Sequence, residues 1–388
     1  MKDELVRAVE AACKELFDVS VHVELTRPDE QFGDYASNAA LKLAGKINGN
    51  PREIAEEIAG MHDKFAGLVE EISVAGPGFL NFRLTDDALW KVAETPPLKK
   101  LDGQKIVAEY GDPNPFKVLH AGHLYTGVAG DALSNLLEAA GGEVHRVNFG
   151  GDVGRHVGIT MWAILRRLDG EFPDKLAEVP AGQRAEWMAE AYVQGTNEFE
   201  ENPAAKQEMI ELNKRVYQLH DRDDHDSPFA QIYWTCRQWS YDYFDSFYVR
   251  AGIKFEKYYP ESETAGLGLE TVKSHVDQVF EYSDGAVIFR GEKVGLHTRV
   301  FVNSEGIPTY EAKDVGLIMK KWEDYHFDRS VVITANDQAQ YMEVVLKAVE
   351  QFAPNLVQGT THLTHGLVKL KGGVKMSSRK GNILRAVD

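Results

Sequence analysis

At 388 residues the chain is too long for one ordinary domain, and its length predicts two or three. Hydrophobic residues make up 43% of the sequence, and the absence of any apolar run of about 18 residues excludes a helical membrane span. The N-terminal residues are of mixed charge and lack the apolar centre of a signal peptide. The two cysteines, Cys13 and Cys236, are isolated, which favours a reduced, cytoplasmic setting and argues against a structural zinc site.

The formal net charge of −17 argues against broad, non-specific binding of nucleic acid. The charge is unevenly distributed, because the segment from Lys369 to Arg385 holds six basic residues and no acidic one. A local basic loop on an acidic body suits the handling of phosphate groups better than the coating of RNA. The overall acidity therefore neither requires nor excludes an RNA partner.

Residues 1–100 are predicted to form a small α+β domain that ends in a proline-containing linker. Its expected elements are a helix over 1–17, a strand over 19–25, a helix opened by the segment 31–40, a helix capped by Asn50 and Pro51, and a hairpin of strands 72–75 and 79–84. No pair of nucleophile and base is evident in this domain.

The next segment predicts a βαβ unit, with strands over 105–109 and 143–149 around a helix over 124–140. The motif His120-Ala-Gly-His123 stands where the first strand turns into the helix, which is where open α/β sheets bind nucleotide phosphates. Taken alone, a helix start with two capping histidines explains the motif equally well. Asp152, in the turn after the second strand, either contacts a ribose or cation or is an ordinary turn aspartate.

The remainder of the chain predicts a doubly wound parallel α/β sheet over 101–388, with a helical and β insertion at about 161–300. Buried packing, not base stacking, is the favoured explanation of the aromatic stretch over 161–259, and a solvated loop is favoured over a metal site at 221–226. Later expected elements are a hairpin over 283–302, a helix from 309, a buried strand over 331–334, a helix over 341–352 and a strand over 363–370.

A second motif, Lys375-Met376-Ser377-Ser378, follows the last expected strand. A His-x-Gly-His loop followed by a Lys-Met-Ser-Ser loop resembles the paired ATP motifs of class I aminoacyl-tRNA synthetases. The resemblance implies a Rossmann-like catalytic domain in which the histidines hold ATP phosphates and the second loop closes over them. The segments 32–40 and 50–55 resemble the N-terminal domain of arginyl-tRNA synthetases, which in that family contacts the elbow of the tRNA.

This resemblance implies that L-arginine is activated by ATP as arginyl-adenylate and transferred to tRNA(Arg), with release of pyrophosphate and AMP. ATP is expected as its Mg²⁺ complex, with no protein-bound structural metal, no membrane partner and a monomeric protein. The expected catalytic residues are Lys117, His120, His123, Lys375 and Lys380. The expected ATP-binding residues are His120, Gly122, His123, Gly366, Lys375, Met376 and Ser377.

The arginine site is predicted from the chemistry of a guanidinium, which prefers carboxylates in a planar arrangement beside an aromatic ring. Glu261, Tyr310 and Asp314 supply these groups, and Tyr310 and Asp314 are four residues apart on one helix face. Asn114 and Gln338 can hold the α-amino and carboxylate end. These five residues match the positions that contact arginine in arginyl-tRNA synthetases.

Two features depart from the family pattern. Ser378 stands where many class I enzymes have a second loop lysine, so this role falls to Lys117, Lys375 or Lys380. The chain also ends at Asp388, whereas the family continues into a helical anticodon-binding domain, so we expect a truncated form. Such a form should bind ATP and arginine yet show little pyrophosphate exchange and almost no tRNA charging until that domain is supplied.

Other functions fit less well. A class I synthetase of lysyl or glutamyl type, or a small nucleotidyltransferase with a His-x-Gly-His loop, would not explain the N-terminal domain and the pocket with two carboxylates. A non-catalytic relative that binds arginine or RNA would not require intact histidines and an intact Lys-Met-Ser loop. The amino acid that stabilises the protein, with and without ATP, distinguishes these alternatives.

Overall fold

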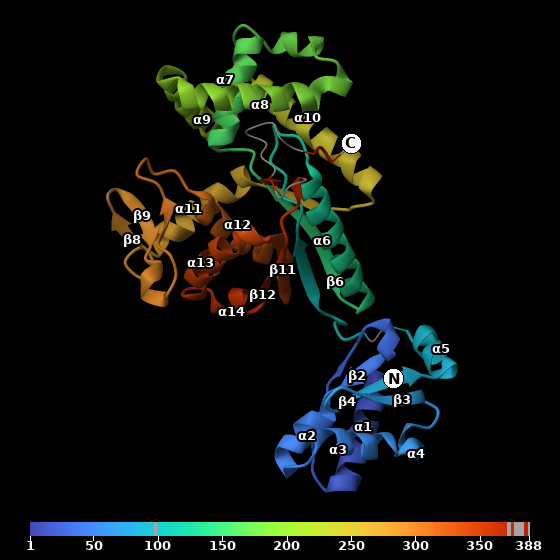
Figure 1. The fold of residues 1–388 in the computed structure, drawn as a ribbon. Helices are drawn as coiled ribbons and strands as arrows, with labels where there is room; N and C mark the ends of the chain where they lie inside the picture. The colour runs from blue at the N-terminus through green and yellow to red at the C-terminus, as the bar shows by residue number, and fades with distance from the viewer. Residues whose placement is uncertain (97–98, 371–373, 376–383, 387–388) are drawn as a thin grey trace. The chain divides into compact units, whose positions relative to one another are not determined.

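The computed structural model describes residues 1–96, 99–370, 374–375 and 384–386 (Figure 1). The chain divides into two compact units, Met1–Pro97 and Leu98–Asp388. Within the described residues, no helix combines the length and the apolar character needed to cross a membrane.

The first unit is built on an antiparallel sheet in the order β1-β2-β4-β3, with its helices packed around a core that includes Leu5, Leu43 and Phe82. Its elements are α1 Lys2–Phe17, β1 Leu25–Thr26, η1 Glu30–Phe32, β2 Tyr35–Ser37, α2 Ala39–Ile47, α3 Pro51–Ala59, α4 His62–Phe65, β3 Val69–Ala75, β4 Phe79–Leu84 and α5 Asp86–Glu94. The predicted cap of α3 is confirmed, because Asn50 Oδ1 accepts a hydrogen bond from the backbone N–H of Arg52 at 3.0 Å.

Two expected elements of this unit are wrong in detail. The strand expected over 19–25 is paired only at Leu25–Thr26, although Val21 and Val23 are buried as the alternating pattern requires. The segment 35–37, expected inside a helix, is strand β2, because its backbone pairs with β1 on one side and with β4 on the other. Helix α2 therefore begins only at Ala39.

The second unit contains a five-stranded sheet in the order β12-β11-β5-β6-β7, and every pairing within it is parallel. This sheet confirms the expected doubly wound α/β fold. Its strands are β5 Lys105–Glu109, β6 Glu143–Gly150, β7 Lys257–Pro260, β11 Arg329–Ala335 and β12 Thr360–His365. The chain adds β6 and β7 on one side of β5, then β11 and β12 on the other, so the strand order reverses between β5 and β11. Ligands of such sheets bind at this reversal, beyond the carboxyl ends of the strands.

The sheet is covered on both faces (Figure 1). Ile106 and Ala108 of β5 pack with side chains of α6, Ala121–Ala139, whereas Val107 packs with Leu317 of α12, Tyr310–Tyr325. The alternation of these neighbours along β5 is the consequence of the two-residue period of a strand. The remaining helices after β11 are η5 Asn336–Gln338, α13 Ala339–Glu350 and α14 Pro354–Gln358.

Between β6 and β7 the chain forms a helical body with its own core, composed of α7 Arg155–Arg167, η2 Pro173–Glu178, η3 Ala181–Gln183, α8 Arg184–Glu201, α9 Pro203–Asp221 and α10 Pro228–Ala251. Trp162, Tyr233 and Trp239 are buried in this core, which confirms packing as the role of these aromatic residues. In the loop 221–226, Asp224 accepts hydrogen bonds from the backbone N–H groups of Asp226 and Ser227 just before α10.

A second excursion follows β7. It consists of α11 Glu261–Ser274, β8 Glu281–Ser283, β9 Ala286–Phe289, η4 Gly291–Val294 and β10 Arg299–Val302, with the three strands in the order β10-β9-β8. Helices α11 and α12 cross closely, because a Cβ on Gly268 would lie 1.9 Å from the carbonyl oxygen of Ala312. The strand expected over 363–370 is divided, since β12 ends at His365 and a short pair, β13 Lys369–Leu370 and β14 Val374–Lys375, follows.

Candidate functional site

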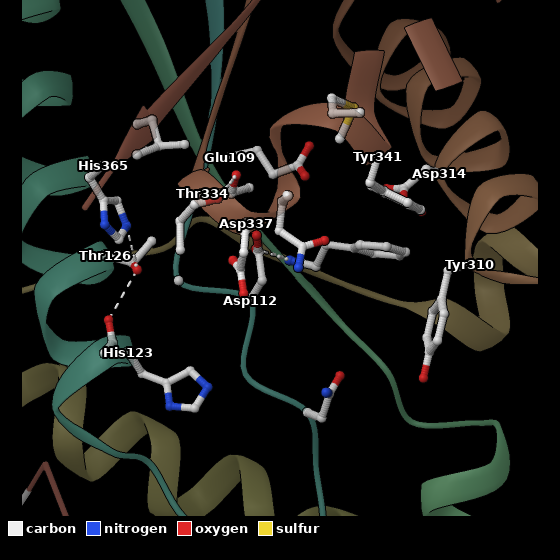
Figure 2. Close-up of a pocket in the computed structure, with 18 of the residues that line it drawn as sticks. Glu109, Asp112, His123, Thr126, Tyr310, Asp314, Thr334, Asp337, Tyr341 and His365 are labelled. Carbon is white, nitrogen blue, oxygen red and sulfur yellow. Dashed lines mark hydrogen bonds between the residues drawn. The ribbon is translucent and has the colours of Figure 1, made fainter. Parts of the chain in front are cut away.

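A cavity of about 610 Å³ lies beyond the carboxyl ends of β5 and β11, at the reversal of strand order (Figure 2). Three segments that are far apart in the sequence form much of its lining. The connection from β5 to α6 contributes Asp112, Asn114, His120, Gly122 and His123; α12 contributes Tyr310, Glu311 and Asp314; and the end of β11 with η5 contributes Thr334, Ala335, Asp337 and Gln338. The predicted residues Asn114, His120, Gly122, His123, Tyr310, Asp314 and Gln338 are thus brought together.

The two histidines cap the start of α6 reciprocally. His120 Nδ1 accepts a hydrogen bond from the backbone N–H of Gly122 at 3.1 Å, and His123 Nδ1 accepts one from the backbone N–H of His120 at 3.1 Å. A backbone N–H can only donate, so each Nδ1 is unprotonated and each neutral ring carries its proton on Nε2. The capping interpretation of the motif is confirmed, and it is compatible with phosphate binding because capping uses Nδ1 and leaves an N–H donor on Nε2.

The electrostatics favour these neutral rings. Burial lowers the pKa of His120, and burial, with the nearby His120 and Lys117, lowers the pKa of His123 well below its usual range. The two rings lie next to each other, with centroids 3.9 Å apart and planes tilted by 31°. At neutral pH the start of α6 therefore presents uncharged N–H donors together with the positive end of the helix dipole, an arrangement suited to phosphate oxygens.

The opposite side of the cavity is acidic and aromatic. Tyr310 and Asp314 stand one turn apart on α12, as their spacing predicts, and Tyr341 Oη donates a hydrogen bond to Asp314 Oδ2. Burial raises the pKa of Asp314 to about 8, the neighbouring carboxylates of Glu109 and Glu261 act in the same direction, and the Tyr341 hydrogen bond opposes the shift. A cation placed beside Asp314 would reverse this shift and hold the carboxyl group ionised.

Glu261 differs from the other predicted arginine contacts. It opens α11, is only 4% exposed and is absent from the lining of the cavity. Its Oε2 accepts a hydrogen bond from Lys313 Nζ at 2.5 Å, and Lys313 is itself only 3% exposed. Burial alone would lower the pKa of Lys313, but the Glu261 carboxylate outweighs it and the pKa lies above its ordinary value. The negative charge of Glu261 is therefore already matched from within the protein.

Asn114 is held by the turn that follows β6. Its Oδ1 accepts a hydrogen bond from the backbone N–H of Gly151 at 2.7 Å. The amide nitrogen of Asn114 is then the group left for an acceptor in the cavity, such as a carboxylate. A Cβ on Gly151 would lie 2.7 Å from Asn114 Oδ1 and 3.0 Å from Glu261 Oε1, so a larger residue there would displace these side chains.

Comparisons with known proteins agree with this geometry. A family model described as "tRNA synthetases class I (R), catalytic domain" matches residues 88–388, and one described as "Arginyl tRNA synthetase N terminal domain" matches residues 1–84. The chain belongs to the arginyl-tRNA synthetase family. This match confirms the family that the paired motifs and the N-terminal segments predicted.

Two relatives illustrate the similarity, both called arginine–tRNA ligase. The protein of Phocaeicola vulgatus is 24% identical over 100% of this chain and 68% of its own length, and that of Bdellovibrio bacteriovorus is 27% identical over 92% and 60%. The fold is similar to the arginyl-tRNA synthetase structures of Thermus thermophilus (TM-score 0.69, 22% identity) and Plasmodium falciparum (TM-score 0.68, 20% identity). These alignments cover 100% and 96% of this chain, and 68% and 66% of the two structures.

The other predicted site residues of this synthetase do not line the cavity or lie outside the described residues. Lys117 Nζ stands 4.9 Å from the ring centroid of Tyr192, in a separate depression. Gly366 is not part of the cavity lining, although its neighbours His365 and Leu367 are. Lys375 is described only as a backbone position of β14, and Met376, Ser377 and Lys380 lie outside the described residues.

Asp152 forms hydrogen bonds that connect three segments of the second unit. Its fully buried carboxylate accepts hydrogen bonds from Arg237 Nε at 2.9 Å and from the backbone N–H and Oγ of Ser262 at 2.9 and 2.7 Å. These bonds tie the turn after β6 to α10 and to the start of α11. Since its oxygens are occupied in this way, the structure favours neither of the two ligands considered for Asp152, a ribose or a cation.

Several cavity residues were not predicted. Glu109 forms a buried ion pair with Lys321, and Glu311 pairs with Arg299 at 3.0 Å. Thr126 Oγ1 and His365 Nε2 lie 2.8 Å apart and join α6 to the end of β12. Asp112 had a signal in the sequence, because it follows a predicted buried strand two residues before Asn114, at the edge where ligands bind.

Proposed function

We propose that this chain activates L-arginine with ATP to form arginyl-adenylate and transfers the arginyl group to tRNA(Arg). The observation that carries the proposal is the combination, in one cavity, of uncharged N–H donors at a helix start and an acidic, aromatic wall on α12. The first suits the phosphates of ATP and the second suits a guanidinium. Membership of the arginyl-tRNA synthetase family and relatives called arginine–tRNA ligase support the same amino acid.

In the proposed reaction, a carboxylate oxygen of arginine attacks the α-phosphorus of ATP. The bond from that phosphorus to the oxygen bridging to the β-phosphate breaks, and pyrophosphate leaves. A hydroxyl group of the tRNA then attacks the carbonyl carbon of the adenylate, and AMP leaves. Neither step needs a covalent nucleophile from the protein, so positioning and electrostatic stabilisation supply the rate.

We assign the ATP end to His120 and His123, whose Nε2–H groups donate to phosphate oxygens, with Gly122 allowing close approach of the backbone. Mg²⁺ arrives as part of the ATP complex and offsets the charge of the phosphates. Lys375, Met376, Ser377 and Lys380 remain proposed contacts on the strength of the family motif alone.

We assign the arginine end to Asn114, Tyr310, Asp314 and Gln338, all of which line the cavity. Asp314 would pair with the guanidinium, Tyr310 would stack on it, and Asn114 and Gln338 would hold the other end of the amino acid. Glu261 would act behind this wall through its ion pair with Lys313 and its proximity to Asn114. In the described conformation Glu261 does not line the cavity, and Lys313 holds its Oε2.

A single-turnover experiment tests the proposal. The protein, in excess over ATP, is mixed with Mg²⁺, tRNA(Arg) and one amino acid, quenched, and examined for aminoacyl-adenylate and AMP by mass spectrometry. Excess protein makes even a slow turnover visible. We expect an adenylate only with L-arginine. An adenylate formed with lysine or glutamate instead of arginine would show that the proposed amino acid is wrong. If no adenylate forms with any amino acid, the proposed activity is contradicted.

A further inference from the structure

His156 is a buried polar side chain that the proposed reaction does not use. It is the second residue of α7, shortly after the turn that follows β6, and it is not among the described residues that line the cavity. Its Nε2 lies 2.7 Å from the carbonyl oxygen of Gly151. A carbonyl oxygen can only accept a hydrogen bond, so Nε2 carries a proton and donates it. Burial, together with the nearby charge of Lys117, lowers the pKa of His156 well below its usual range, so the ring is neutral and Nδ1 is unprotonated.

Packing alone does not explain a polar ring at position 156. Within the part of the chain that the structure describes, Nδ1 of His156 is buried and has no hydrogen-bond partner. An unsatisfied buried acceptor costs free energy that an apolar side chain of similar size would avoid. The hydrogen bond from Nε2 to Gly151 is therefore what the imidazole contributes at this position.

The residue that His156 holds also holds Asn114. The backbone N–H of Gly151 donates to Asn114 Oδ1 at 2.7 Å, and the carbonyl group of the same residue accepts from His156. Three of the five residues from 150 to 154 are glycine, which leaves the backbone more conformational freedom than any other residue. Contacts from outside the turn must therefore fix its conformation. Asp152 anchors the turn to α10 and α11, and His156 anchors the carbonyl group of Gly151.

The orientation of Gly151 decides which end of the Asn114 amide is left for a ligand. An amide side chain accepts hydrogen bonds at its oxygen and donates them from its nitrogen. Because the N–H of Gly151 engages Oδ1, the amide nitrogen remains for the cavity that Asn114 lines. A carboxylate can accept a hydrogen bond from that nitrogen, whereas the oxygen would repel it. A turn whose Gly151 N–H pointed elsewhere would therefore remove the preference of Asn114 for a carboxylate.

We propose that His156 is a positioning residue for the amino acid substrate and acts through Gly151 and Asn114. By holding the carbonyl group of Gly151, His156 keeps the N–H of that residue on Asn114 Oδ1 and the amide nitrogen of Asn114 free for the substrate carboxylate. The assignment rests on the proposed function, in which Asn114 holds the α-amino and carboxylate end of arginine. His156 touches no substrate itself, but it fixes a contact that places the reacting carboxylate.

The test compares two ligands on matched variants. His156→Met keeps a side chain of similar length without an N–H donor, whereas His156→Gln keeps a donor that can reach the Gly151 carbonyl. L-Arginine is compared by calorimetry with agmatine, which is arginine without its carboxylate. We expect His156→Met to bind L-arginine about tenfold more weakly, the scale of one hydrogen bond to a charged group, and agmatine with unchanged affinity. His156→Gln should bind both ligands as the unmodified protein does.

A double-variant cycle tests the path through Asn114. In an Asn114→Ala background, which lacks the amide, His156→Met should cause no further loss of affinity for L-arginine. A further loss in that background, an equal loss for both ligands, or unchanged L-arginine affinity in His156→Met would overturn the assignment. His156→Asn, which is polar but too short to reach Gly151, provides the same comparison if the Met variant does not fold. The proposed function fails separately, and recognisably, if the unmodified protein binds neither compound.

Discussion

Replacing Glu261 by Gln should destabilise the second unit even when no substrate is present. The substitution preserves the shape of the side chain but leaves the Lys313 ammonium, 3% exposed, without its carboxylate partner at 2.5 Å. The rings of Tyr310 and Tyr217 also lie near the ammonium, with centroids 5.2 and 5.7 Å away. Removal of one partner from a buried ion pair costs about 3 to 5 kcal/mol, so we expect a loss of this size.

The magnitude is measured by urea unfolding of the free protein, followed by tryptophan fluorescence, because five of the six tryptophans lie after residue 97. The matched variants are Lys313→Met, which should also destabilise, and the double variant Glu261→Gln/Lys313→Met. Since the double variant leaves no unpaired charge, it should recover most of the stability, and the cycle should give a coupling energy of about 2 kcal/mol or more.

This experiment separates two roles for Glu261. If Glu261 is a free arginine ligand, Glu261→Gln should unfold like the unmodified protein without arginine and lose affinity for arginine. That result would refute the structural role argued from the Lys313 contact. A large loss of stability without arginine would confirm that the carboxylate is engaged before the substrate arrives.

Three further outcomes follow from the geometry. Asp314→Asn should weaken L-arginine binding by about 2 to 4 kcal/mol. Because a pKa of about 8 keeps much of Asp314 protonated at neutral pH, calorimetry on the unmodified protein should show affinity rising as the pH rises from 6 to 8, and this rise should be smaller in the variant. His123→Asn retains an acceptor for the backbone N–H of His120 but lacks the Nε2–H donor. Quenched-flow assays should therefore show slower adenylate formation, while the affinity for arginine stays nearly unchanged. If the rate of adenylate formation and the arginine affinity fall equally, His123 has a purely structural role. Gly268→Ala should lower the free energy of unfolding, measured by thermal unfolding, by about 1 to 3 kcal/mol or more, because α11 and α12 must separate to admit the methyl group. Gly266→Ala on the same helix, with open space around it, should be neutral or slightly stabilising. Equal effects of the two substitutions would contradict the close crossing of the helices.

The parts of the fold that depend on local pattern were predictable from the sequence. The apolar run over 331–334 and the capped start at Asn50 both appear where the residues placed them. Tyr35–Ser37 was mistaken for helix because its strand character depends on β4, more than forty residues later in the chain. A short segment whose conformation is decided by a distant partner has little local signal.

The residues of the candidate site likewise include some that the sequence predicted and some that it did not. Asn114, Tyr310 and Asp314 were predicted to face one pocket, and the parallel sheet places them around one cavity. The partner of Glu261 was not predictable, because Lys313 lies 52 residues away and nothing in either local sequence indicates the pairing. Asp112 was overlooked although it had a signal in the sequence, because it follows a predicted buried strand two residues before Asn114.

The most direct test of the central claim is the amino acid that this protein binds. L-Arginine and L-lysine are titrated into the protein by calorimetry, with and without ATP and Mg²⁺. The planar guanidinium of arginine suits the side of the cavity formed by Asp314 and Tyr310. The side chain of lysine is shorter and ends in a compact ammonium group, which leaves part of the Asp314 carboxylate without a hydrogen-bond donor. We expect arginine to bind and lysine to bind much more weakly, in both conditions. Equal affinity for the two amino acids, or binding of lysine alone, would contradict the account.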